Sequence, residues 1–345
     1  MEKYKVSVIT DENKVKYYEL DKKEPVDNEV LVKVHSSAIC TLEQRVFKGI
    51  KPIYPFAGGH EVSGIVEKIG SKVKSVSKGD KVVIRTLNTC GECEFCRSGH
   101  ENLCRVSYQS STHSEFKGPG GLSEYMTVDA AKVYKLDQDV NLSFASLTEP
   151  LACCIHSIKK ANIDFGDNVV VMGVGIMGLF HIQLAKLRGA KVIACDINEE
   201  RLEIASNLGA DITINSSDNK LLIKKINEIT KGRGVDVSIC TVPSTLVAAD
   251  CVSITGKLGR VVMYTSFYPD NPIDTSPNKI HSTEKTITGA VSPTNKDFLI
   301  ATKLISNNVI DMENVITDII PMTNLKKAFE KALKPSSYRI LIDFS

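Results

Sequence analysis

The sequence predicts an α/β protein in two parts, a β-rich first part followed by a doubly wound parallel sheet. Residues 29–35 alternate apolar and polar side chains like a half-buried strand, and glycines separate short apolar runs as far as residue 79. That pattern is typical of a small twisted or barrel-like β unit. From residue 168 onward, apolar runs alternate with helix-like stretches, which indicates a parallel sheet covered by helices on both faces.

Each element of the second part follows from local periodicity. We expect helices in its connections and, after about residue 285, a weaker pattern whose last strand either extends this sheet or returns to the first part. The expected strands are residues 168–172, 191–195, 235–240, 259–263 and 339–343, and the expected helices are 179–187, 200–208, 297–306 and 323–333.

Composition narrows the class of protein. The 345 residues allow one large domain or two ordinary ones, and 42% hydrophobic with 24% charged residues is typical of a folded globular chain. A formal net charge of +2 favours neither nucleic acid nor an anionic membrane as partner. No secretory signal opens the sequence and no apolar run is long enough to span a bilayer, so we expect a cytoplasmic protein that acts on a small molecule.

Four of the ten cysteines crowd into one short segment. Cys90, Cys93, Cys96 and Cys104 are spaced C-x2-C-x2-C-x7-C. In a reducing compartment such spacing favours a metal over disulfides, and four thiolates can surround one zinc at about 2.3 Å. Because protein fills every position, this zinc would be structural. An iron–sulfur cluster and free buried cysteines remain the alternatives.

A glycine-rich turn follows the strand expected at 168–172. The segment Gly173-Val-Gly-Ile-Met-Gly178 opens the next helix, where the backbone of Gly173, Gly175, Ile176, Met177 and Gly178 can approach the pyrophosphate of a dinucleotide. The alternative is a purely structural glycine turn.

Two charged residues beyond that turn bear on the choice of cofactor. Asp196 ends the next strand, where its carboxylate can accept hydrogen bonds from the adenosine ribose and repel a 2′-phosphate. NAD is therefore favoured, although the nearby Arg201 leaves NADP open.

A second metal site is suggested by three residues far apart in sequence. Cys40, His60 and Glu149 together offer a thiolate, an imidazole and a carboxylate, whereas each alone is more often core or surface. Three protein ligands with an open fourth position are typical of a catalytic zinc, which polarises an oxygen and lowers the pKa of a bound hydroxyl.

These motifs resemble one known family. Gly59-His-Glu-Val-Ser-Gly64, with Gly70 and Val73, resembles the G-H-E-x2-G-x5-G-x2-V signature of the zinc-containing medium-chain alcohol dehydrogenases. The cysteine segment and the glycine turn follow in the order of that family, so the resemblance covers nearly the whole chain. Glu149-Pro-Leu resembles a stretch of its polyol, sorbitol and threonine dehydrogenase-like branch.

The resemblance implies a domain plan and an assembly. A GroES-like catalytic domain would comprise residues 1–151 and 286–345, with the cysteine lobe at about 88–106. A Rossmann NAD-binding domain would comprise 152–285, with the active site in the cleft. Relatives are dimers or tetramers, so a homodimer or homotetramer is expected.

The resemblance also implies roles for single residues. Glu149 would be the third ligand of the catalytic zinc, and Glu61 would swing toward that zinc during turnover. Arg339 would contact the pyrophosphate of the cofactor.

The chain departs from the family after its first ligand. The family reads C-G-[ST]-D-x-H, whereas this chain reads Cys40-Thr-Leu-Glu-Gln-Arg45, so Leu42 replaces the proton-relay hydroxyl and Arg45 replaces a relay histidine. Thr41 could supply a hydroxyl instead. Arg45 could hold a substrate carboxylate, phosphate or vicinal hydroxyls, or it could be exposed or paired with Glu43. Ser292-Pro293 replaces an Arg-Tyr pair of polyol dehydrogenases, which argues against a sorbitol-type substrate.

Together these observations predict a zinc-dependent oxidoreductase with two zinc ions per chain. It would transfer hydride between NAD and a secondary alcohol: a polyol, a sugar alcohol or its phosphate, or a hydroxy amino acid. A zinc-free reductase of the quinone oxidoreductase type is disfavoured by both metal motifs. A sensor that binds NAD and zinc without turnover is favoured only by the altered stretch 40–45.

Overall fold

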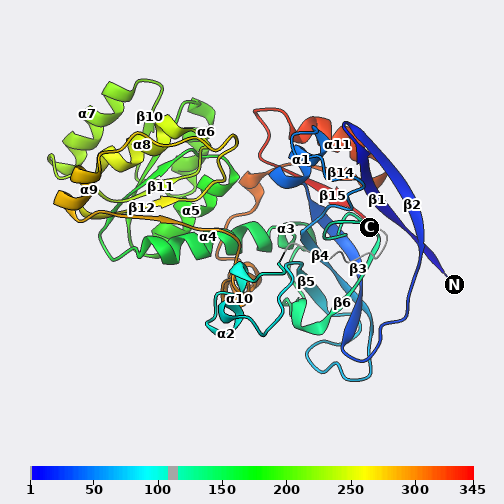
Figure 1. Ribbon diagram of the computed structural model, residues 1–345. Helices are drawn as coiled ribbons and strands as arrows, with labels where there is room; N and C mark the ends of the chain where they lie inside the picture. The colour runs from blue at the N-terminus through cyan, green and yellow to red at the C-terminus, as the bar shows by residue number, and fades with distance from the viewer. Residues whose placement is uncertain (1, 108–115) are drawn as a thin grey trace. The chain divides into compact units, whose positions relative to one another are not determined.

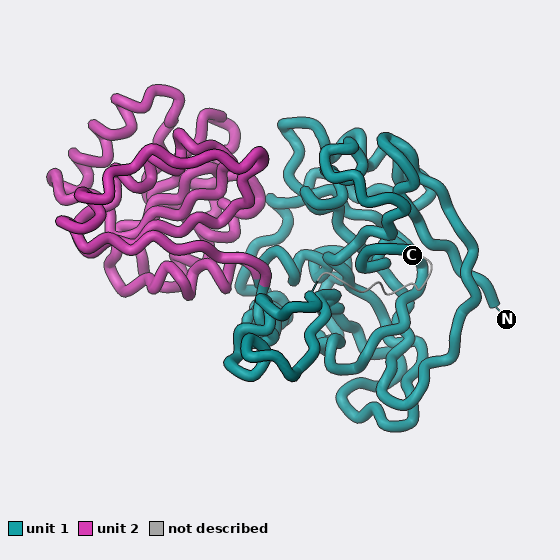
Figure 2. The backbone as a smooth tube through the Cα atoms, viewed as in Figure 1, with its two compact units in different colours: residues 1–152, 293–345 teal, residues 153–292 magenta. Residues whose placement is uncertain are grey.

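The computed structural model describes residues 2–107 and 116–345 and divides into two compact units. Unit 1 comprises residues 1–152 and 293–345, and unit 2 comprises residues 153–292 (Figure 2). The sequence placed the return to the first domain at residue 286. The structure places it later, because β13 (Thr286–Gly289) pairs in parallel with β12 (Thr255–Met263) of unit 2.

Unit 1 is built on a largely antiparallel sheet around β3 (Glu29–Ala38). This strand pairs with β4 (Glu61–Ile69) on one side and with β6 (Tyr125–Asp129) and β15 (Arg339–Asp343) on the other. The last expected strand therefore returns to the first part of the chain. The sheet also contains β5 (Lys81–Arg85), β7 (Val133–Lys135) and β14 (Ile316–Pro321), while β1 (Lys3–Asp11) and β2 (Lys14–Asp21) form a separate hairpin.

Packing between two helices of unit 1 fixes the segment that begins at Cys40. The short helix α1 (Thr41–Phe47) follows β3 directly, with Cys40 as its N-cap. Its last residue, Phe47, stacks on Phe329 of α11 (Leu325–Ala332) with ring centroids 4.6 Å apart, and both rings are fully buried. Two buried aromatic rings contribute several kilocalories per mole to the core and fix the orientation of α1.

The remaining elements of unit 1 are short, apart from two helices. Helix α4 (Thr148–Ala161) begins in unit 1 and continues into unit 2, and α10 (Asn295–Ser306) follows the second crossing of the chain (Figure 1). Among the described residues, none of the helices has the length and apolarity needed to cross a membrane. The short elements are α2 (Glu94–Arg97), η1 (Glu101–Leu103), η2 (Ala130–Lys132), α3 (Leu142–Ala145), η3 (Glu313–Val315) and η4 (Met322–Asn324).

Unit 2 is a six-stranded parallel sheet of order β10-β9-β8-β11-β12-β13 with helices on both faces (Figure 1). Its order reverses beside β8 (Asn168–Met172), because β9 (Lys191–Asp196) pairs on one side and β11 (Val235–Cys240) on the other. The predicted fold class is confirmed. Ligands of doubly wound sheets bind at the carboxyl ends of the strands, at such a reversal of strand order. Unit 2 also contains β10 (Ile212–Asn215), α5 (Ile176–Leu187), α6 (Glu199–Asn207), α7 (Asn219–Thr230), α8 (Thr245–Ile254) and α9 (Pro277–Thr283).

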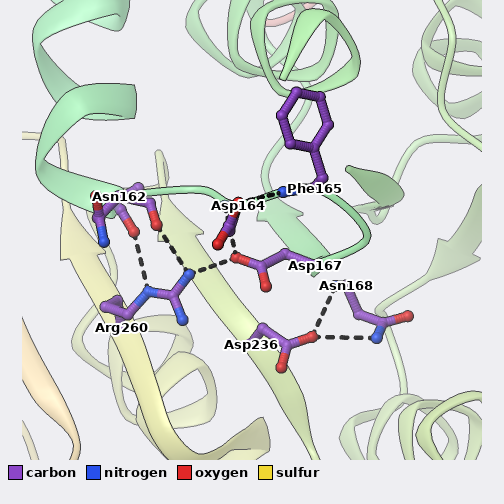
Figure 3. A network of polar contacts seen from close by, with 8 residues as sticks. Asn162, Asp164, Phe165, Asp167, Asn168, Asp236 and Arg260 are labelled. Atoms are coloured by element: carbon purple, nitrogen blue, oxygen red, sulfur yellow. Dashed lines mark hydrogen bonds and ion pairs between the residues drawn. The ribbon is translucent and has the colours of Figure 1, made fainter. Parts of the chain in front are cut away.

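The opposite, amino-terminal edge of this sheet is fixed by a polar network (Figure 3). Arg260 of β12 donates to the backbone oxygens of Ala161 and Asn162 at 3.1 and 3.0 Å and pairs with the carboxylate of Asp167. Asp236 of β11 accepts from the backbone and side-chain nitrogens of Asn168 at 2.8 and 3.1 Å. The network anchors the starts of β8 and β11 and the middle of β12, and the glycine turn lies at the carboxyl end of β8.

Candidate active site

The four cysteines of the lobe are arranged as one tetrahedral metal site requires. Their sulfur atoms all lie within 4.8 Å of one another, with Cys90–Cys104 at 3.6 Å and Cys90–Cys96 and Cys93–Cys104 at 3.9 Å. Four thiolates about 2.3 Å from one zinc would lie roughly 3.8 Å apart, so the donor set fits zinc. A backbone N–H of the lobe, that of Cys96, lowers the pKa of Cys93 to about 6, which favours the thiolate form that metals bind.

A second cluster forms around His60, immediately before β4. Cys40, Glu43 and His60 place one ligand atom each within 4.8 Å of one another, and His60, Glu61 and Glu149 do the same. The three predicted ligands therefore lie around one imidazole, although no set among the described residues contains both Cys40 and Glu149. Glu149 comes from the first turn of α4, and Glu61 is the first residue of β4.

Glu43 holds the imidazole of His60. Its fully buried carboxylate accepts from the N–H of Gly59 at 2.9 Å and lies 2.9 Å from His60 Nδ1. With Nδ1 donating to this carboxylate, Nε2 is the ring atom available to a metal, the usual arrangement of a metal-binding histidine. The sequence interpretation considered Glu43 only as a partner of Arg45. The acidic position in the family's C-G-[ST]-D-x-H stretch was the signal that could have identified it.

The charges of this cluster support one another despite burial. Burial alone would lower the pKa of His60, but the neighbouring Glu43 and Cys40 raise it well above its ordinary value. Burial alone would raise the pKa of Glu43, and the opposing charge of His60 instead lowers it. Glu43 and Cys40 thus favour a positive charge on or beside the imidazole of His60. A bound metal cation can supply that charge in place of the second ring proton of His60.

Arg339 and Glu61 form a buried ion pair in the same cluster. Arg339 Nη2 donates to Glu61 Oε1 at 2.7 Å and Nη1 donates to the backbone oxygen of Ile39 at 3.2 Å. Burial raises the pKa of Glu61 to about 7 even though Arg339 opposes that shift. The other oxygen, Oε2, is buried with no hydrogen-bond partner within the described part of the chain. The predicted contact between Arg339 and a cofactor pyrophosphate stays a prediction.

Of the altered stretch after Cys40, residues 41–45, the structure draws Glu43 into a ligand set but not Thr41, Leu42 or Arg45. Thr41 is exposed at the start of α1, and Arg45 is half-buried one turn later. Leu42, which replaces the relay hydroxyl, packs against the apolar core of unit 1. The carboxylate of Glu43 is bonded to Gly59 and His60. Catalytic roles for Thr41 and Arg45 stay predictions.

In unit 2, the glycine turn links β8 to α5 at the reversal of strand order. A Cβ at Gly173 would lie 2.4 Å from a methyl group of Val242, and one at Gly178 would lie 2.0 Å from the backbone oxygen of Gly173. The fold itself therefore requires these two glycines. Gly175 differs, because its φ of −65° and ψ of −176° suit any residue and a Cβ there would meet nothing closer than Arg201, at 3.9 Å. Free space over this backbone is what close approach of a pyrophosphate needs.

Asp196 connects the carboxyl end of β9 to the same turn. Its Oδ2 accepts from the N–H of Val174 at 2.8 Å, and its Oδ1 accepts from the N–H of Asn198 at 3.0 Å. Ile176 and Met177 form the first turn of α5. The structure thus brings the predicted cofactor residues of unit 2, Arg201 included, to one edge of the sheet.

A GroES-like unit with two metal-type clusters and a dinucleotide-type parallel sheet define a two-domain dehydrogenase class. Comparison with known families agrees: residues 26–138 match the alcohol dehydrogenase GroES-like domain, and residues 176–307 match zinc-binding dehydrogenase. The chain belongs to the zinc-containing medium-chain alcohol dehydrogenase family, which confirms the resemblance drawn from its motifs.

Individual relatives cover nearly all of the chain. D-arabitol-phosphate dehydrogenase of Enterococcus avium is 30% identical over 95% of this chain and 93% of the relative. L-threonine 3-dehydrogenase of Bacillus subtilis is 32% identical over 88% of this chain and 87% of the relative. The solved structure of an Escherichia coli short chain alcohol dehydrogenase complexed with NADH is 25% identical, with a TM-score of 0.90 over 99% and 100% of the two chains. These similarities support an alcohol oxidoreductase that uses zinc and a nicotinamide cofactor.

Proposed function

We propose that this chain is a zinc-dependent oxidoreductase that transfers a hydride between a secondary alcohol and NAD. The observation that carries the proposal is that Cys40, Glu61 and Glu149 lie around His60. Glu43 accepts a hydrogen bond from Nδ1 of this imidazole. The relatives named for arabitol phosphate and threonine support a polyol, a sugar alcohol or its phosphate, or a hydroxy amino acid as substrate.

Two separate groups of residues would each bind one zinc ion. Cys40, His60 and Glu149 would hold the catalytic zinc, with Glu61 as an alternative ligand, and the four lobe cysteines would hold the structural one. A bound catalytic zinc supplies a Lewis acid that makes a hydroxyl more acidic. Glu43 orients the imidazole of His60. Arg339 pairs with the buried carboxylate of Glu61 and so holds it beside the same imidazole. Arg45 and Thr41 remain candidates for binding a substrate group or moving the hydroxyl proton.

NAD is proposed over NADP because of the charge beside the turn. The Asp196 carboxylate ends β9 beside the glycine turn and accepts the N–H of Val174. An acidic residue at this position of a dinucleotide-binding fold binds the adenosine ribose, and its negative charge would disfavour a 2′-phosphate. In the reaction, the hydride leaves the carbinol carbon for the nicotinamide and the hydroxyl proton is released, which leaves a ketone. A homodimer or homotetramer is proposed from the family alone.

Metal analysis and a coupled activity screen test the proposal together. We expect about two zinc ions per chain and formation of NADH with at least one secondary alcohol, faster with NAD than with NADP. His60→Ala should abolish turnover and remove one zinc, while Cys104→Ser should remove the other. Binding of zinc and NADH without turnover of any alcohol would instead support a sensor, and turnover without zinc would support a zinc-free reductase.

A further inference from the structure

A buried polar cluster lies behind the glycine turn of unit 2, and the proposed reaction does not use it. His181 of α5 has no exposed surface; its Nδ1 lies 2.7 Å from the backbone oxygen of Met177 and its Nε2 lies 2.8 Å from Ser157 Oγ of α4. The ring of Tyr264 packs edge-on against this imidazole, with centroids 4.6 Å apart.

The contacts define the protonation of His181. A backbone oxygen can only accept, so Nδ1 carries the hydrogen, and Nε2 then accepts from the hydroxyl of Ser157. Burial lowers the pKa of His181 to about 4, so the ring is neutral near pH 7. The side chain thus has one tautomer and one orientation.

The acceptor of this bond belongs to the turn that meets the dinucleotide. The backbone oxygen of Met177 and the N–H of Gly178 are parts of one rigid peptide plane. The first N–H groups of a helix have no acceptor within it, and Gly178 is the third residue of α5, so its N–H is available to an anion. Cys154 Sγ approaches the same Met177 oxygen at 3.6 Å. Two side chains therefore contact the oxygen end of the peptide plane whose nitrogen end lies in the first turn of α5.

We propose that His181 is a positioning residue for the dinucleotide: by holding the backbone oxygen of Met177 it orients the N–H of Gly178 toward the pyrophosphate. The inference rests on the proposed function, because it assigns the ligand of this turn as a nicotinamide dinucleotide. His181 itself does not touch the cofactor. Its loss acts on cofactor affinity and not on the chemical step.

Two substitutions separate the two bonds of the imidazole. In His181→Asn the amide nitrogen occupies the place of Nδ1 and keeps the hydrogen bond to the backbone oxygen of Met177. In His181→Gln the longer side chain reaches Ser157 instead, and the hydrogen bond to Met177 is lost. Because one hydrogen bond is worth about 1 kcal/mol, we expect a roughly 5- to 10-fold higher Kd for NADH in His181→Gln. His181→Asn and the control Ser157→Ala should stay within about 2-fold of the wild type. In His181→Gln the KM for NAD should rise while kcat at saturating NAD is unchanged.

The result that overturns the inference is an equal rise of Kd in His181→Asn and His181→Gln, or a fall of kcat without a change of Kd. Failure of the wild type to bind NADH would refute the proposed function and this inference with it. If the variants do not fold, ¹⁵N NMR of the wild-type imidazole still decides: the inference requires the Nδ1–H tautomer, and an Nε2–H tautomer would refute it. Cys154→Ala, which removes the second donor to Met177, should raise the Kd by a smaller factor, and an unchanged Kd would count against the role of this oxygen.

Discussion

Replacing Gly175 by Ala tests whether the glycine turn binds a dinucleotide. The backbone angles of Gly175 suit alanine, and the added methyl group would meet only the guanidinium of Arg201, at 3.9 Å. The folded chain should therefore accept this substitution without loss of stability. A pyrophosphate that passes close to this backbone would collide with the methyl group, so the variant should bind NADH more weakly.

The magnitude follows from the cost of overpacking. One methyl group forced into a filled space costs about 1–3 kcal/mol, which is roughly a 5- to 150-fold rise in the Kd for NADH. Gly178→Ala is the matched control, because its Cβ would lie 2.0 Å from the backbone oxygen of Gly173. The turn must open by roughly 1 Å to relieve that contact, so this variant should lose about 1–3 kcal/mol of stability and several degrees of Tm even without cofactor.

Fluorescence titration with NADH and thermal unfolding of the cofactor-free proteins check both variants. The expected pattern is unchanged Tm with weaker binding for Gly175→Ala, and lowered Tm for Gly178→Ala. If Gly175→Ala binds NADH like the wild type at the same Tm, no pyrophosphate lies against this glycine and the proposed cofactor site is wrong. If instead its Tm falls as far as that of Gly178→Ala, the space over Gly175 is not open.

Three further outcomes are expected. Glu43→Ala should weaken zinc binding at the His60 cluster by about 10- to 100-fold while the lobe keeps its zinc, as competition with a chelator would show; equal retention at both sites would contradict the role of Glu43. Arg260→Met should lower the free energy of unfolding by about 2 kcal/mol and leave the Kd for NADH unchanged, because its partners lie at the opposite edge of the sheet; urea unfolding measures the loss. The pKa of His181 is about 4 in the folded chain and about 6.5 in the unfolded chain, so only the unfolded chain readily takes up this proton. The free energy of unfolding is therefore unaffected by His181 above pH 6.5 and decreases as the pH falls toward 4, by up to about 3 kcal/mol. Denaturant unfolding across this pH range should show that component in the wild type and not in His181→Asn.

Local pattern predicted part of unit 2: strands β8, β9, β11 and β12 and helices α5 and α6 were expected, whereas β10, β13, α7, α8 and α9 were not. Long-range pairing lay beyond local pattern. The expected strands 168–172 and 235–240 coincide with β8 and β11 of unit 2, and 339–343 coincides with β15 of unit 1. Helix α5 begins at Ile176, before the expected residue 179, because Gly178 weakens helix propensity yet is needed for its contact with Gly173. The pairing of β15 with β3 joins residues about 300 positions apart, and no local signal distinguishes it from extension of the parallel sheet.

The candidate sites divide in the same way. The cysteine lobe and the glycine turn were predictable because their ligating atoms come from one short segment. The ligand types of Cys40, His60 and Glu149 suggested the cluster at His60 in sequence, but spacing could not bring them together, since they come from three separate parts of the chain. His181 showed no partner in sequence, because Ser157 lies on another helix and the acceptor at Met177 is a backbone oxygen. Side chains that act on the backbone of a motif leave no pattern that spacing can detect.

Removal of zinc from the cysteine lobe should loosen the start of α10. Glu101 lies in η1 between Cys96 and Cys104, and its carboxylate accepts the backbone N–H of Asn295, the first residue of α10. This N–H has no acceptor within its own helix, so the lobe supplies its protection from exchange. A chelator that empties the lobe should speed amide exchange at Asn295, whereas the capping box keeps the N–H groups of Thr294 and Asp297 protected. Glu101→Ala with zinc retained should speed the same amide, and an unchanged rate in both cases would show that the lobe and this helix are independent.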